Sequence, residues 1–117
     1  MKLHKIKFVL YVEDFDVMKK FYQEVFDLPE IEGTKGWAEL AFDDFVLALD
    51  HSEKVDIEET RLSFYVSDLK RVIEKVKALG GKILVEPEFG ENKTIAVAKI
   101  SDPEGNFFYA AQEFDSS

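Results

Sequence analysis

In two short segments of the chain, polar and apolar side chains are mixed at every second position, and we call these residues the mixed set. The set consists of Lys7, Val9, Tyr11, Arg61, Ser63 and Tyr65. Alternation by two places the members of each segment on one face of a strand. Lysine and arginine bind anionic or carbonyl oxygens, and tyrosine rings stack on planar ligands. Because an apolar surface with a few convergent polar groups is typical of small-molecule sites, we expect these residues to line one.

The two cations also allow an interpretation in which no ligand is involved. If Lys7 and Arg61 lie near strand ends, their charged groups reach water and pair with neighbouring acidic residues. The residues that alternate with the mixed set are all apolar: Phe8, Leu10, Val12, Leu62, Phe64 and Val66. We expect these apolar side chains to pack beneath helices, which leaves the mixed set on the other face of each strand.

The two segments belong to an internal repeat. Residues 7–15 align with residues 61–69, and an amphipathic pattern follows in each half. Its apolar positions have a 3-4-3 spacing and are Phe15, Met18, Tyr22 and Val25 in the first half and Leu69, Val72, Val76 and Leu79 in the second. This spacing predicts one helix of about three turns in each half.

Residues with special backbone preferences mark the ends of both predicted helices. Asp14 and Asp68 precede them, where a carboxylate can accept a hydrogen bond from the first turn. The first helix is expected to end before Pro29, and the second at Gly80 and Gly81, where a left-handed cap has no steric cost.

The hydrophobic period changes from 3.6 to 2 after each helix, which predicts strands. They are expected over residues 37–42, 45–50, 82–86, 94–100 and 106–112, with a weaker candidate at 30–32. Before the last strand, Asp102-Pro103-Glu104-Gly105 predicts a tight hairpin, because proline presets φ and glycine permits a positive φ.

These elements predict an α+β fold in which two βαβββ modules form a curved mixed sheet around a cleft. The chain is expected to be a single domain over residues 1–117. Module one covers about residues 1–50, a polar and acidic connector covers about 51–59, and module two covers about 60–117.

Composition and motifs argue against several classes of function. The chain has no cysteine, which excludes thiolate metal sites and cysteine nucleophiles and fits a cytoplasmic protein. A net charge of −9 argues against nucleic-acid binding, which depends on clustered Lys and Arg. No apolar run approaches the ~20 residues that span a bilayer. The sequence also has no glycine-rich phosphate loop and no Gly-x-Ser-x-Gly motif.

The paired βαβββ layout resembles the vicinal-oxygen-chelate superfamily. Further marks of the resemblance are Phe21-Tyr22 in the first helix and Asp102-Pro103-Glu104-Gly105-Asn106 before the last strand. The superfamily includes glyoxalase I, the extradiol dioxygenases, fosfomycin-resistance enzymes and bleomycin-resistance proteins. Because one fold carries many activities, the resemblance does not itself name a reaction. It does imply a homodimer.

Metal enzymes of this superfamily bind a divalent ion with His, Gln or Glu from the opening strand of each half and a Glu from the last strand. In this chain the matching positions hold Lys7, Arg61 and Tyr109. Two protonated cations and a phenol are not a plausible ligand set for a divalent ion. We therefore expect no metal and no other cofactor, and the sequence leans away from an enzyme.

Other residues offer little support for a different metal site. His4 and His51 are the only histidines. His4 is expected on the strand face opposite Lys7, and His51 in the connector, so both are expected to be surface residues. Asp50 and Glu39 could contribute to a different site, but their spacing shows no convergence.

The first hypothesis is a metal-free protein that binds, and thereby sequesters, a small molecule. The expected ligand-binding residues are Lys7, Val9, Tyr11, Trp37, Arg61, Ser63, Tyr65, Phe107 and Tyr109. Lys7 and Arg61 favour an anionic ligand, whereas the net charge of −9 favours a cationic one. The alternatives are a glyoxalase-type lyase or dioxygenase with non-standard metal ligands, and a module whose aromatic residues serve assembly with itself or another protein.

Overall fold

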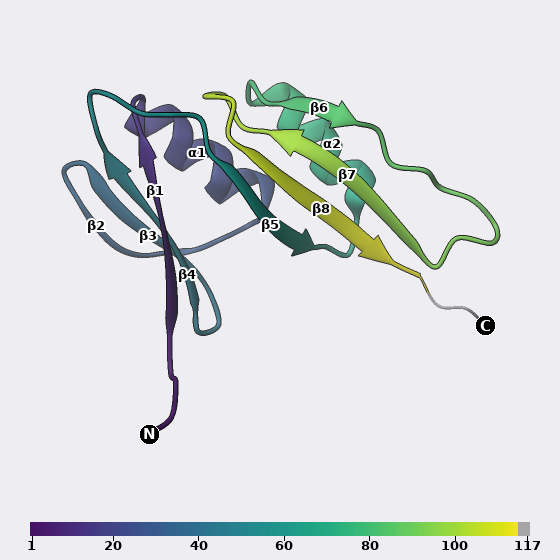
Figure 1. Cartoon of the computed structure of the whole chain (residues 1–117), viewed down its shortest axis with the longest axis horizontal. Coiled ribbons are helices and arrows are strands. Elements are labelled where there is room, and N and C mark those ends of the chain that lie inside the picture. Colours follow the sequence, from purple (N-terminus) through teal and green to yellow (C-terminus); the bar gives the residue numbers. More distant parts are fainter. Residues whose placement is uncertain (115–117) are drawn as a thin grey trace. The chain divides into compact units, whose positions relative to one another are not determined.

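The computed structural model describes residues 1–114 of the chain. Within them, two compact units follow one another, Met1–Asp56 and residues 57–114, and each contains one βαβββ module (Figure 1). The α+β class and the repeated module are therefore confirmed. Neither helix in the described part of the chain is long and apolar enough to cross a membrane.

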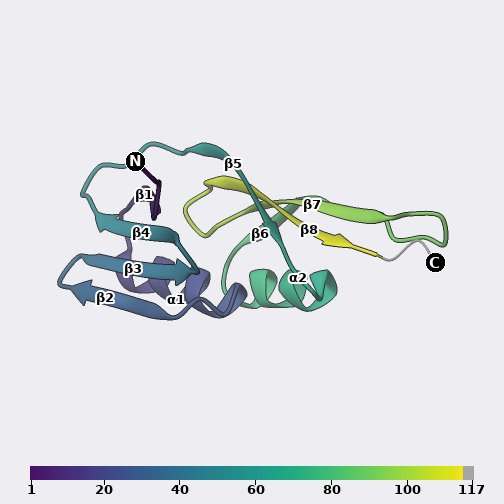
Figure 2. The same ribbon diagram turned by 90° about the horizontal axis from the view of Figure 1, so that it is seen from below.

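The first unit builds a four-stranded mixed sheet. Its elements are β1 (Ile6–Val12), α1 (Phe15–Val25), β2 (Glu30–Thr34), β3 (Trp37–Phe42) and β4 (Phe45–His51). The strand order is β1-β4-β3-β2, with β1 parallel to β4 and the other neighbours antiparallel. Figure 2 shows α1 lying along one face of this sheet.

The second unit repeats this arrangement. Its elements are β5 (Glu59–Tyr65), α2 (Leu69–Ala78), β6 (Lys82–Val85), β7 (Ile95–Ser101) and β8 (Phe107–Glu113). The order β5-β8-β7-β6, with β5 parallel to β8, matches the order of the first sheet.

Both helices begin where the capping residues predict. The Asp14 side chain accepts a hydrogen bond from the backbone N–H of Val17 at 3.3 Å, and the Asp68 side chain accepts one from Arg71 at 3.2 Å. Each satisfies a first-turn N–H that has no partner within the helix. After α2, Gly80 adopts a φ of +91°, which glycine tolerates without a Cβ clash.

The apolar alternate positions of the opening strands face the helices, as predicted. Leu10 and Val12 are buried in the first unit together with Met18 and Phe21 of α1. In the second unit Phe64 is half-buried, and its ring meets the Phe108 ring edge-to-face at 5.4 Å. The remaining positions of β1 and β5 therefore face away from the helices.

The predicted hairpin before β8 is held by a buried polar cluster. Asp102 Oδ1 accepts hydrogen bonds from the backbone N–H groups of Glu104 at 2.9 Å and Asn106 at 3.0 Å. The Asn106 amide donates to Asp102 Oδ2 at 2.9 Å and accepts from the backbone N–H of Glu58 at 2.8 Å. The cluster therefore ties the segment before β5 to the start of β8.

Two details of the first unit correct the expectations. His51 is the last residue of β4 and not part of the connector, because parallel pairing with Val12 and a hydrogen bond to Gly36 extend the strand. His4 precedes β1, which begins at Ile6, so it has no strand face. The connector is consequently residues 52–58, and the other strand ends differ from prediction by at most two residues.

Candidate functional site

The first unit brings the mixed set of β1 together with residues of β4 and β3. Cross-strand partners point to the same face of a sheet. Lys7 is paired with Val46, whereas Val9 is paired with Ala48 and, through it, with Glu39. Tyr11, Asp50 and Trp37 form the next row. The residues in these rows lie on the sheet face opposite α1, which we call the open face of unit one, although Val46, Ala48 and Glu39 are buried within it.

A three-residue network occupies this face. Lys7 Nζ donates to Glu39 Oε2 at 3.1 Å, and Trp37 Nε1 donates to the same oxygen at 3.0 Å. Glu39 is only 3% exposed, whereas the Lys7 side chain is 40% exposed. A buried carboxylate is costly unless it is paired and hydrogen-bonded, and here it is both.

The network fixes the charge of Glu39. The hydrogen bond from the Trp37 indole, followed by the Lys7 ammonium, lowers the pKa of the Glu39 carboxyl below its ordinary value, although burial opposes this shift. Glu39 is therefore an anion near neutrality, and it is the counter-ion of Lys7. Lys7 therefore pairs with a neighbouring acidic residue, as in the interpretation without a ligand. Its positive charge is largely neutralised within the same unit.

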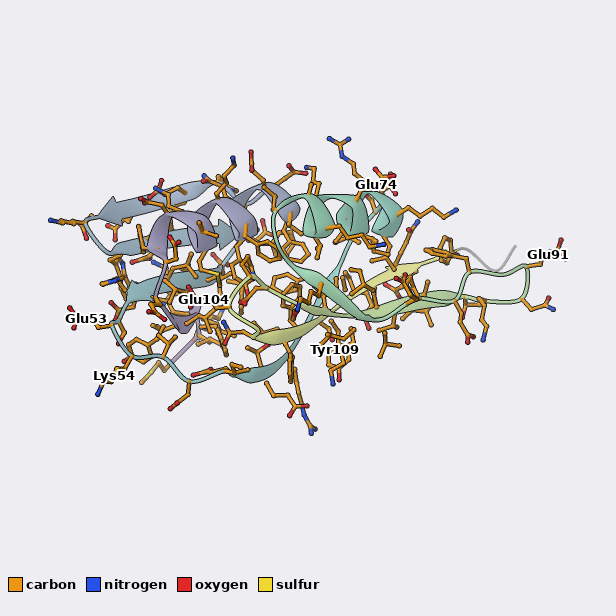
Figure 3. The ribbon with its side chains drawn as sticks, turned by 90° about the horizontal axis from the view of Figure 1, so that it is seen from above. Glu53, Lys54, Glu74, Glu91, Glu104 and Tyr109 are labelled. Carbon is orange, nitrogen blue, oxygen red and sulfur yellow. The ribbon has the colours of Figure 1, made fainter. Side chains whose placement is uncertain are left out.

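The second unit also has an open face, and it is more exposed. Across β5, β8 and β7, one row contains Ser63, Tyr109 and Lys99, and the next contains Tyr65, Ala111 and Val97. Tyr65 is 60% exposed and Val97 43% exposed. Figure 3 shows Tyr109 extending from β8 on the side away from α2. These two rows, with Arg61 and Phe107, form the open face of unit two.

Lys99 holds a defined position on this face. Its ammonium group lies 5.0 Å from the centroid of the Phe107 ring. An aromatic face attracts a cation through its quadrupole but does not neutralise its charge. No described residue forms an ion pair with Lys99 or with Arg61.

Arg61 lies in a bulge that interrupts the pairing of β5 with β8. Glu59 is opposite Phe107, and Ser63 is opposite Tyr109, so three residues of β5 face one residue of β8. Thr60 bridges the gap, because its hydroxyl donates to the Phe107 carbonyl at 2.7 Å and accepts from the Leu62 N–H at 3.1 Å. Arg61 itself has a φ of +56°, in the left-handed region.

The structure places the predicted ligand-binding residues in two groups. The first group is Lys7, Val9, Tyr11 and Trp37 on unit one, and the second is Arg61, Ser63, Tyr65, Phe107 and Tyr109 on unit two. A cleft shared by both units stays a prediction. Lys99 was missed from the sequence, although this residue alternates with Ile95 and Val97. The sequence also indicated no partner for Glu39, which follows Trp37 by the same two-residue step.

The superfamily's metal-ligand positions do not fit a divalent ion in this chain. Lys7 is a protonated donor to Glu39, and Arg61 is a permanent cation, so both would repel a metal. Within residues 1–114, no group of three or more His, Asp or Glu side chains is arranged to hold a metal ion. One oxygen of the Glu39 carboxylate already accepts two hydrogen bonds.

Comparison with known proteins identifies the fold family. Residues 3–109 match the model of the Glyoxalase/Bleomycin resistance protein/Dioxygenase superfamily, whereas no curated protein sequence matches the chain. A glyoxalase/bleomycin resistance protein/dioxygenase family enzyme from Burkholderia phytofirmans PsJN is similar in structure, with a TM-score of 0.75 and 21% identity over 92% of this chain and 97% of its own.

Two further solved structures have the same fold. Lactoylglutathione lyase from Agrobacterium tumefaciens has a TM-score of 0.67 and 19% identity, over 92% of this chain and 91% of its own. The E144Q glyoxalase I mutant from Zea mays has a TM-score of 0.70 and 22% identity, and the match covers 96% of this chain but 46% of the maize protein. With the family match over nearly its whole length, the chain belongs to the Glyoxalase/Bleomycin resistance protein/Dioxygenase superfamily.

Proposed function

We propose that this protein binds a small molecule on the open faces of its sheets and does so without a metal ion. The observation that carries the proposal is the Lys7–Glu39–Trp37 network. A lysine ammonium stands at a position where metal-binding members of the superfamily have a ligand, and its charge is directed at a buried carboxylate. An internal cation thus takes the place that a bound metal would need.

The remaining residues of the open faces support binding through apolar and aromatic contact. Tyr65 and Val97 are exposed on unit two, and Val9 and Tyr11 on unit one. Exposed aromatic and aliphatic groups beside a few polar groups are the usual lining of small-molecule sites. We propose sequestration of the ligand as the role of this surface.

The test is a measurement of metal content and metal response. Elemental analysis of the purified protein is combined with thermal unfolding in the presence of nickel, manganese, zinc and ferrous ions. We expect neither stoichiometric metal nor a shift in Tm. Stoichiometric metal together with a marked rise in Tm would contradict the proposal and favour a metal-dependent enzyme.

A gain-of-binding variant serves as the positive control. Within unit two, combining Arg61→His and Tyr109→Glu supplies ligand types that the superfamily uses at these positions. If this variant takes up nickel or zinc while the parent does not, the positions are suitable and the side chains prevent binding. Metal uptake by the parent at the level of the variant would refute the role assigned to Lys7.

The proposal extends to assembly and location. We propose that the protein is a homodimer, as its resemblance to the superfamily implies, and that it works in the cytoplasm, which the lack of cysteine supports. Light scattering coupled to size-exclusion chromatography tests the first point. A mass of 13.5 kDa, that of one chain, would contradict the dimer.

A further inference from the structure

The two open faces differ in what neutralises their cations. On unit one, Lys7 is paired with Glu39, and a further acid, Asp50, lies in the adjacent row. On unit two, Arg61 and Lys99 have no acidic partner among the described residues. The acids on that face are Glu59, opposite Phe107, and Glu113, opposite Ile95, and neither forms an ion pair with the two cations.

The backbone at Arg61 points to the same residue independently. Asp27 and Asp43 are the other non-glycine residues with positive φ among residues 1–114, and both lie in turns, where aspartate tolerates this conformation. Arg61 is different, because it lies within a strand and has a long side chain. Bulges commonly re-aim a side chain, and residues held in unfavourable conformations are concentrated at functional sites.

We propose that the open face of unit two binds an aromatic carboxylate, with the carboxylate at Arg61 and Lys99 and the ring against Tyr65 and Tyr109. The proposal rests on the proposed ligand-binding function and names its ligand class. A guanidinium group presents parallel N–H donors that match a carboxylate, and a phenol ring offers a stacking surface. The two cations at the site, and not the overall net charge of −9, therefore determine the charge of the ligand. A ligand contacts only the groups nearest to it.

Three ring compounds of the same size test the charge of the ligand. Benzoate is an anion, benzamide is neutral, and benzamidine is a cation. Each is titrated into ¹⁵N-labelled protein, and backbone amide shifts are followed. We expect benzoate to bind about 10-fold more tightly than benzamide and benzamidine. We expect its shifts at Ser63, Tyr65, Val97 and Tyr109, and not at Val9 and Tyr11.

Matched variants test the cations. Arg61→Met and Arg71→Met each remove one arginine and leave the same net charge, but Arg71 is an exposed residue of α2. The preference for benzoate should disappear in Arg61→Met and persist in Arg71→Met. Lys99→Met should weaken benzoate binding, with Lys77→Met, an exposed lysine of α2, as its control. Arg61→Lys should restore part of the preference, because it keeps the charge but not the paired donors.

The outcomes separate this inference from the function on which it rests. If benzamide or benzamidine binds the open faces as tightly as benzoate does, or if benzoate binding is unchanged in Arg61→Met, the ligand class is wrong and the binding function stands. Benzoate shifts centred on Lys7 would also refute the assignment to unit two. If none of the three compounds shifts either face, both the inference and the proposed binding function fail.

Discussion

The two halves of this chain have the same topology but treat the same strand positions differently. The opening strand of unit one pairs with β4 in an unbroken register over seven residues, and its lysine is neutralised by Glu39. The opening strand of unit two is bulged, and its arginine is left without an acidic partner among the described residues. A repeated module can thus keep one framework while the cation of one opening strand has an acidic partner and that of the other has none among the described residues.

The comparison of the two units requires that both modules present equivalent faces. The variants with the largest expected effect on stability test this equivalence. Leu10 and Phe64 occupy matching positions beneath the two helices. Leu10→Ala and Phe64→Ala should each lower the free energy of unfolding by about 3 kcal/mol, measured by urea denaturation. Tyr65→Ala, on the open face, should change it by less than about 0.5 kcal/mol. A larger loss for Tyr65 than for Phe64 would reverse the assignment of faces in unit two.

Removing the counter-ion of Lys7 tests whether the network on unit one stabilises the folded state. Glu39→Ala leaves the Lys7 ammonium and the Trp37 N–H without their acceptor and should cost about 1–2 kcal/mol, because the partly exposed lysine can still reach water. The control Glu53→Ala removes the same charge from an exposed residue of the connector. Equal unfolding midpoints for the two variants would show that the network contributes nothing to stability.

For the strained backbone at Arg61 in unit two, we expect a substitution to change stability in the opposite direction. Arg61→Gly should leave stability unchanged or raise it by up to about 1 kcal/mol, since glycine has no steric cost at a φ of +56°. Arg71→Gly in α2 should instead cost about 1 kcal/mol. Thermal unfolding of both variants checks this. A loss in Arg61→Gly as large as that in Arg71→Gly would mean that Arg61 is not strained.

The smallest expected effect is a pH dependence confined to unit one. The pKa of the Glu39 carboxyl is lowered from its ordinary value of 4.5, so the folded state favours the ionised form. This contribution is present above the ordinary pKa and is lost as the pH falls through the lowered one. Below about pH 4.5, the free energy of unfolding of wild type should therefore fall more steeply than that of Glu39→Gln. Glu53→Gln, the control, should follow wild type.

Much of the fold could be predicted because its signals are local. The helix caps at Asp14 and Asp68, the apolar spacing of both helices and the Asp102–Asn106 hairpin each depend on residues within a few positions of one another. Such signals are visible in a single sequence. The end of β4 at His51 was missed because it depends on pairing with Val12, which is distant in sequence.

The candidate site was predicted in part, for the same physical reason. Alternation placed the mixed set of β1 and β5 on the sheet face that lies away from the helices, since side chains of a strand alternate between its two sides. The partner of Lys7 could not be read from sequence, because Glu39 reaches it only through the order β1-β4-β3. The same holds for the bulge at Arg61 and for Lys99, whose place beside Tyr109 depends on the register of β7 with β8.

The contrast between the two faces is tested most directly by a crystal structure of the protein grown with benzoate. We expect one benzoate on the face formed by β5, β8 and β7, with its carboxylate bound by Arg61 and Lys99. We also expect Lys7 to remain paired with Glu39. Benzoate bound at Lys7, with Glu39 displaced and the unit two face empty, would contradict the assignment of the ligand to unit two.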